Sequence, residues 1–166
     1  MADEETLTEM ETREIAFTPE EFREAARDFR GVIVRAEYNT PWTIENSPFA
    51  ETQKIPQMRI QIRPTDQPIK DQYEWYAPTN IKNTRWYYFI KALNDLGVVI
   101  QPEGNTLEER INDFCKKLIG LEFQWKDHQN LPGLRPGRVI QRLLLPVRFY
   151  GKREVKPETG VTVVQI

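Results

Sequence analysis

The chain has 166 residues, of which 29% are charged, and its formal net charge at pH 7 is −2. The mean hydropathy is −0.62, and no apolar stretch reaches the roughly 18 residues that a transmembrane helix needs, so we expect a soluble protein with no membrane partner. This length predicts one domain, which we place at residues 15–166 behind a flexible acidic arm at 1–14.

The single cysteine, Cys115, cannot form an internal disulfide, which is typical of a reducing compartment. The start of the chain is acidic and lacks the basic and apolar regions of a signal peptide. We therefore expect a cytoplasmic protein, in the host cytoplasm if the protein is viral.

Charge is unevenly distributed along the chain. Residues 1–30 hold ten acidic side chains and four arginines, whereas the rest of the chain holds nineteen basic and fifteen acidic ones. Residues 133–156 alone carry seven basic side chains and one acidic one. An acidic start before a mildly basic body hints at a polyanionic partner, although charge alone also fits ordinary solvated faces.

The first predicted element is a helix. Thr18-Pro19-Glu20-Glu21 is a capping box with proline at the first helical position, and apolar residues recur at helical spacing from Phe22 to Phe29. The helix is expected to end at Arg30-Gly31.

Three strands follow, each indicated by the alternation of apolar and polar residues. They are expected at 32–38, 58–63 and 72–76, and the alternation is cleanest in the second. The prolines and aromatic residues of 39–56 predict a long loop, a kind of segment that often carries function.

Two helices are predicted next, at about 84–96 and 106–118, the second opened by the capping box Thr106-Leu107-Glu108-Glu109. A hairpin then follows, and the apolar end of the chain is a candidate sixth strand. The two hairpin strands are expected at 120–126 and 139–150, with their loop at 128–137. The last strand is expected at 161–166.

This order of elements predicts an α+β protein that is mainly β. We expect a five- to six-stranded Greek-key barrel of the oligonucleotide-binding (OB) type, with helices between the third and fourth strands and an extra N-terminal helix.

The sequence lacks the residue patterns of catalysis and metal binding. His128 is the only histidine, there is no glycine-rich phosphate loop, and no cluster of Cys, His, Asp or Glu has ligand spacing. The paired acids Glu20-Glu21 and Glu108-Glu109 are explained by helix starts. We therefore expect neither an enzyme nor a bound metal or cofactor.

Aromatic and basic residues are interleaved on the predicted strands, as a groove for single-stranded nucleic acid requires. Trp75 could face either way, because alternation does not say which side of its strand is inward, and Trp42 and Tyr88 are equally open. Four other aromatic residues, Trp86, Phe89, Phe114 and Phe123, are interpreted as core. The candidate stacking residues are Trp42, Tyr73, Trp75 and Trp125, and the candidate phosphate contacts are Arg59, Arg63, Lys126, Arg135, Arg138 and Arg142.

One block of the sequence resembles a known family. Trp86-Tyr87-Tyr88-Phe89-Ile90-Lys91-Ala92-Leu93 leads to Leu96-Gly97-Val98, and the next helix ends in Leu118-Ile119-Gly120-Leu121-Glu122-Phe123. Together with the strand before this block and the hairpin after it, residues 31–150 resemble single-stranded-DNA-binding and related replication or recombination proteins of bacteriophages and mobile elements. The resemblance implies an OB fold and non-sequence-specific binding of single-stranded DNA in replication, recombination or repair.

The chain departs from bacterial single-strand binders at its end, where Val163-Val164-Gln165-Ile166 stands in place of their acidic tip. The alternative function is a structural or protein-interaction barrel, for virion or replisome assembly, that binds no nucleic acid. The net negative charge, the proline-rich loop at 39–56 and the apolar last strand favour it. RNA in place of DNA also stays open, as do a second copy of the chain and replication proteins as partners.

Overall fold

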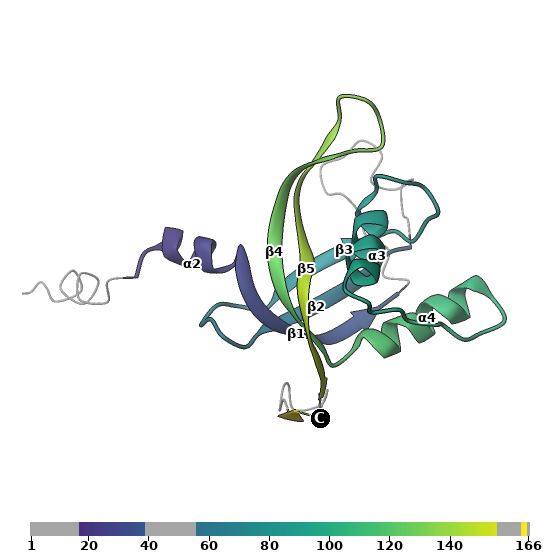
Figure 1. The fold of residues 1–166 in the computed structure, drawn as a ribbon, viewed down its shortest axis with the longest axis horizontal. Coiled ribbons are helices and arrows are strands. Elements are labelled where there is room, and N and C mark those ends of the chain that lie inside the picture. Colours follow the sequence, from purple (N-terminus) through teal and green to yellow (C-terminus); the bar gives the residue numbers. More distant parts are fainter. Residues whose placement is uncertain (1–16, 39–55, 156–163, 166) are drawn as a thin grey trace, which may run out of the picture.

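The computed structural model describes residues 17–38, 56–155 and 164–165, which form an α+β fold (Figure 1). Five antiparallel strands make one curved sheet in the order β3-β2-β1-β4-β5, and the two-residue β6 pairs with the end of β5. Two of the three described helices lie between β3 and β4 in the sequence, as predicted, and no described helix is long and apolar enough to cross a membrane. The elements are α2 (Pro19–Ala25), β1 (Asp28–Glu37), β2 (Met58–Pro64), β3 (Gln72–Tyr76), α3 (Arg85–Asp95), α4 (Leu107–Leu118), β4 (Leu121–Pro132), β5 (Val139–Glu154) and β6 (Val164–Gln165).

The N-terminal helix is shorter than the sequence predicts. Its capping box is present, because the Thr18 hydroxyl accepts from the Glu21 N–H at 3.1 Å and the Glu21 carboxylate accepts from the Thr18 N–H at 2.7 Å. The helix ends at Ala25, however, so the expectation that it reaches Arg30 is wrong. Phe29 is instead fully buried in β1 opposite Trp125. The free energy gained by burying that ring exceeds what one more turn of helix would contribute.

β1 contributes to the curvature of the sheet. Its first half pairs with β4 and its second half with β2, and the register shifts at a bulge between Ile33 and Arg35. Such a bulge bends its strand and increases the local twist. At Gly31, where the two ladders meet, a Cβ would lie 2.9 Å from the Ile62 side chain, so this close approach requires glycine.

The core fills the inner side of the curved sheet. Met58, Ile60 and Ile62 of β2 are fully buried, which confirms the predicted alternation of apolar and polar residues in this strand. α3 packs against β5 and β3, and α4 packs against β1. Phe89, Phe114 and Phe123 are buried as predicted, and Trp86 lies half-buried with its ring edge-on to Phe114.

The sheet is not closed into a barrel, which corrects the predicted barrel architecture. Side chains bridge β3 and β5 where a closed barrel would have a backbone ladder. The Glu74 carboxylate accepts from the Leu144 N–H of β5 at 3.0 Å and forms an ion pair with Arg85 of α3. Arg85 also donates to the carbonyls of Trp75 at 3.1 Å and Arg142 at 3.0 Å. The Leu144 N–H and the Arg142 carbonyl of β5 are thus bonded to the side chains of Glu74 and Arg85, so they do not pair with the backbone of β3.

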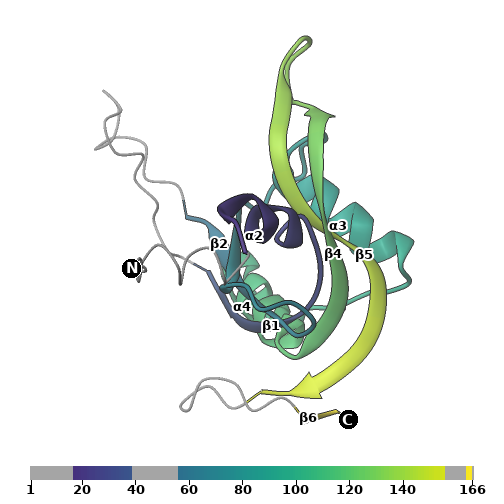
Figure 2. The same ribbon diagram turned by 90° about the vertical axis from the view of Figure 1, so that its left-hand side faces the viewer.

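The last two long strands extend further than predicted. β4 and β5 stay paired as far as Pro132 and Val139, so only 133–138 form the loop that the sequence placed at 128–137. Figures 1 and 2 show this hairpin projecting beyond the other strands. We call residues 126–145 the hairpin arm.

Replacing Arg85 with alanine should lower the free energy of unfolding by about 2–3 kcal/mol, because the buried Glu74 carboxylate loses its ion pair. Burial raises the pKa of Glu74 and Arg85 opposes that effect, so the unpaired carboxylate should bind a proton more readily. Urea unfolding at pH 7 measures the loss. The control is Lys91→Ala, which breaks the exposed Lys91–Asp95 pair and should leave the midpoint of urea unfolding nearly unchanged. Equal losses of stability in the two variants would contradict the role of Arg85 in bridging β3 and β5.

A second cluster of ion pairs, around Glu122 of β4, fastens β1 to the end of β5. The Glu122 carboxylate accepts from Arg30 at 2.7 and 3.1 Å and from the Thr65 hydroxyl at 3.0 Å, and it pairs with Arg153 at 2.8 Å. Burial alone would raise the pKa of Glu122, but the hydrogen bonds and positive charges of these partners lower it below its ordinary value of 4.5.

This lowered pKa should make stability depend on acid pH. The unfolded chain binds a proton at Glu122 more readily than the native state does, so the stabilisation is complete above about pH 4.5 and is lost as the pH falls below it. We therefore expect Glu122→Gln to reduce the free energy of unfolding at pH 7 and to reduce it progressively less below pH 4.5. Urea unfolding at a series of pH values tests this, and a pH-independent loss would refute it.

Candidate nucleic-acid interface

The outward face of β2 and β3 carries aromatic and basic side chains in register. Arg59 lies opposite Trp75, and Gln61 lies opposite Tyr73. Because the alternate residues of β3 are buried, Tyr73 and Trp75 both face outward, which answers the question that the sequence left open. Their ring centres lie 6.2 Å apart, and Tyr73 is 40% exposed. The two rings therefore form one aromatic surface beside an arginine.

Acidic neighbours hold the arginines of this face in place. The Arg63 guanidinium donates to both carboxylate oxygens of Asp71, at 2.9 and 2.7 Å. Arg59 lies 3.6 Å from Glu37 and 5.5 Å from the ring centre of Tyr73. Burial alone would raise the pKa of Asp71, but its hydrogen bonds, led by those from Arg63, lower it. The face thus presents ordered guanidinium groups whose charge is partly neutralised.

The basic and aromatic face continues across β1 and β5, where the sequence indicated no binding residues. The Arg30 guanidinium lies 3.9 Å from the ring centre of Tyr150, and Arg148 lies 5.1 Å from the same ring. Arg35 also faces outward and pairs with Glu37 at 2.8 Å. Tyr150 and Arg148 stand out in the sequence as aromatic and basic residues, but only the pairing of β1, β4 and β5 brings them next to Arg30.

The remaining predicted phosphate contacts lie on the hairpin arm and not on the β2–β3 face. Arg142 pairs with Asp127 at 2.8 Å, and its carbonyl accepts from Arg85, which also bonds the Trp75 carbonyl. The root of the arm therefore lies beside Trp75. The predicted contacts on the arm, all of them exposed, are Lys126, Arg135, Arg138 and Arg142.

One of the predicted stacking residues, Trp125, is not found on this surface. Trp125 is fully buried, its indole N–H donates to the Gly31 carbonyl at 3.0 Å, and its ring packs edge-on against Phe123. It faces inward because β4 crosses the core at this point, so we remove it from the predicted stacking residues. Trp42 lies outside the described residues.

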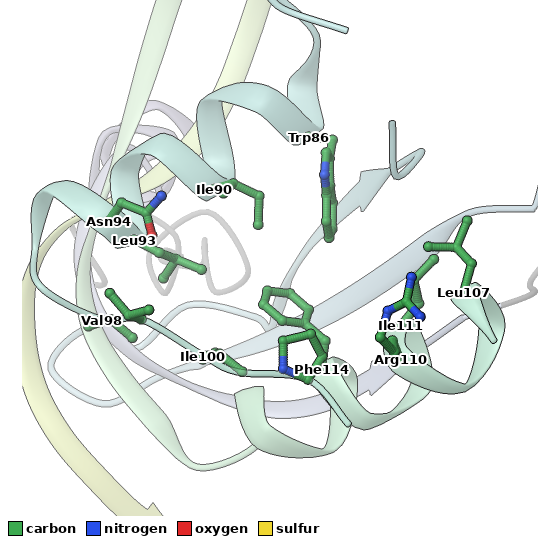
Figure 3. Close-up of a pocket in the computed structure, with 12 residues that line it drawn as sticks. Trp86, Ile90, Leu93, Asn94, Val98, Ile100, Leu107, Arg110, Ile111 and Phe114 are labelled. Atoms are coloured by element: carbon green, nitrogen blue, oxygen red, sulfur yellow. The ribbon is translucent and has the colours of Figure 1, made fainter. Parts of the chain in front are cut away.

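An apolar cavity of about 280 Å³ lies between α3 and α4 (Figure 3). Trp86 and Ile90 line it from α3, and Ile111 and Phe114 line it from α4. Arg110 is the one charged residue in this lining, which contains no histidine, cysteine or carboxylate. The cavity can therefore hold an apolar group but offers no acid–base or nucleophilic chemistry.

The described residues contain neither a cluster of metal ligands nor an activated thiol. No group of three or more His, Cys, Asp or Glu side chains there could hold a metal ion. Burial raises the pKa of Cys115 to about 12, so this thiol is a poor nucleophile at neutral pH. The outward face is consequently the strongest candidate for a functional site.

Comparisons of the chain with protein-family models, with curated proteins and with solved structures gave no match.

Replacing Asp71 with asparagine should strengthen the binding of a single-stranded oligonucleotide, because it frees Arg63 and removes one negative charge from the face. We expect an affinity gain of about fivefold at low salt, the equivalent of one charge pair at 4 Å in water. The slope of log affinity against log salt should steepen by about 0.7.

The matched control is Asp95→Asn, which makes the same charge change on α3, away from the face. Fluorescence anisotropy at several salt concentrations compares the two variants. An equal gain in both would show that net charge alone, and not the position of Asp71, controls binding.

Proposed function

We propose that the protein binds single-stranded DNA without sequence specificity, on the outward face of β2 and β3. The observation that carries this proposal is the pair of outward rings, Tyr73 and Trp75, with Arg59 and Arg63 beside them on the neighbouring strand. An aromatic ring stacks on any base, because every base has a π-face, and each stacked base contributes about 1–3 kcal/mol. Arginines supply the salt-dependent contacts to phosphate.

The order of the strands supports an OB-type fold that stays open between β3 and β5. β1 pairs with both β2 and β4, and helices separate β3 from β4, as in a five-stranded, partly open Greek-key barrel. Such barrels bind oligonucleotides on the face of the second and third strands and on the loops between strands 1 and 2 and between strands 4 and 5. In this chain the β4–β5 loop is 133–138, and the residues between β1 and β2 at 39–55 lie outside the described residues.

In this proposal the protein acts by binding alone, with no catalytic step, metal or cofactor, in replication, recombination or repair in the cytoplasm. The face offers no feature that distinguishes a 2′-hydroxyl from a hydrogen, so RNA is a second ligand to compare with DNA.

The second candidate is a protein-interaction module for virion or replisome assembly, and the apolar cavity between α3 and α4 favours it. Binding to an apolar partner should persist as salt is raised, whereas binding to nucleic acid should weaken steeply. Salt dependence therefore distinguishes the two functions.

The proposal predicts tight, salt-sensitive binding of fluorescent oligo-dT, measured by anisotropy, with a blunt duplex as the comparison ligand. Trp75→Ala should weaken that binding by about 5- to 100-fold at every salt concentration, because a stacking contact is lost while the phosphate contacts stay. Phe17→Ala is the control, since Phe17 is an exposed aromatic residue that precedes α2 and contacts Phe22. Absence of oligo-dT binding at low salt would overturn the proposed function and leave the interaction module.

A further inference from the structure

The tip of the hairpin arm exposes apolar side chains among positive charges. Leu134 is 58% exposed and Val139 is 50% exposed, with the exposed Arg135 and Arg138 between them in the sequence. Residues 128–141 contain no aspartate or glutamate, so nothing on this stretch neutralises the arginines. On the β2–β3 face, by contrast, acidic residues pair with both arginines.

Hydrogen bonds close the tip and tie it to α3. The Gly133 N–H donates to the Arg138 carbonyl at 2.7 Å, and the Arg138 N–H donates to the Arg135 carbonyl at 3.0 Å. A Cβ at Gly133 would lie 2.9 Å from the Arg138 carbonyl oxygen, so this closure requires glycine. The Tyr88 hydroxyl of α3 donates to the Pro132 carbonyl at 2.6 Å and fixes the arm just before its tip. These bonds order the backbone on both sides of Leu134, which lowers the entropy cost of a contact there.

The position of the arm connects the tip to the proposed binding face. Its root is tied to β3 beside Trp75 through Arg85. From the Asp127–Leu144 pair the arm runs five residue steps to its last pair, a distance of about 17 Å. A strand bound on the rings of β3 can thus continue along the arm and reach its tip.

We propose that the tip is a wedge that recognises the junction between a single strand and a duplex, with Leu134 packed against the terminal base pair. This inference rests on the proposed function. Apolar side chains such as leucine insert at base steps and partly unstack them, and contacts to the neighbouring phosphates offset the cost. Arg135 and Arg138 both follow Leu134 within four residues, so they are close enough in the sequence to supply such phosphate contacts.

The experiment compares three DNA ligands by anisotropy: oligo-dT, a blunt duplex, and a duplex that carries a dT tail of the same length as the free oligonucleotide. The wild-type protein should bind the tailed duplex about fivefold or more tightly than oligo-dT. Leu134→Ser should abolish that preference, so that this variant binds the tailed duplex and oligo-dT with equal affinity. Leu134→Met, which keeps an apolar side chain, should retain the preference.

A second readout follows the wedge directly. 2-Aminopurine placed in the terminal base pair of the tailed duplex should brighten when the wild-type protein unstacks it, and should not brighten with Leu134→Ser. Val147→Ser is the matched control, since Val147 is an exposed residue of β5 outside the arm.

Equal affinity of the wild-type protein for the tailed duplex and oligo-dT, or an undiminished preference in Leu134→Ser, would overturn the wedge and leave single-strand binding intact. Failure of the wild-type protein to bind oligo-dT would overturn the proposed function itself. The two failures are therefore distinguishable.

Discussion

The ion pair between Glu74 of β3 and Arg85 of α3 determines how β3 and β5 meet, and the rest of the structure is arranged around it. A buried ion pair stabilises a fold only when the remaining hydrogen-bonding groups also find partners. Here the carboxylate also accepts from the Leu144 N–H, and the guanidinium also reaches the carbonyls of Trp75 and Arg142. The bridge lets the sheet curl around its core without closing, and it anchors the hairpin arm next to Trp75.

The same strand carries the bridge and the proposed binding surface. Because side chains alternate along β3, Glu74 and Tyr76 face the core while Tyr73 and Trp75 face outward. The Tyr76 ring stacks on Phe89 of α3 with centres 4.5 Å apart, which holds the strand from its inner side. The aromatic surface is therefore supported by packed residues one position away, as a preorganised binding site needs.

The two surfaces that could receive a partner are made of different residues. The outward face draws on the strands and combines rings with partly neutralised arginines, whereas the cavity between α3 and α4 is apolar with one charged residue in its lining. A nucleic-acid strand and an apolar partner would not compete for the same side chains. The proposed single-strand binding and the alternative protein interaction would therefore use different surfaces of the fold.

Local signals in the sequence determined much of this protein. The capping boxes at Thr18 and Thr106, the alternation in β2, and the positions of α3 and α4 all depend on residues a few positions apart, and the structure confirms them. Tertiary packing alone decided that Phe29 joins a strand and that Trp125 faces the core, because both depend on the pairing of β1 with β4, which are distant in the sequence. It also decided that β3 and β5 meet through a buried carboxylate and its arginine partner and not through a backbone ladder, because this pairing exists only once the chain has folded.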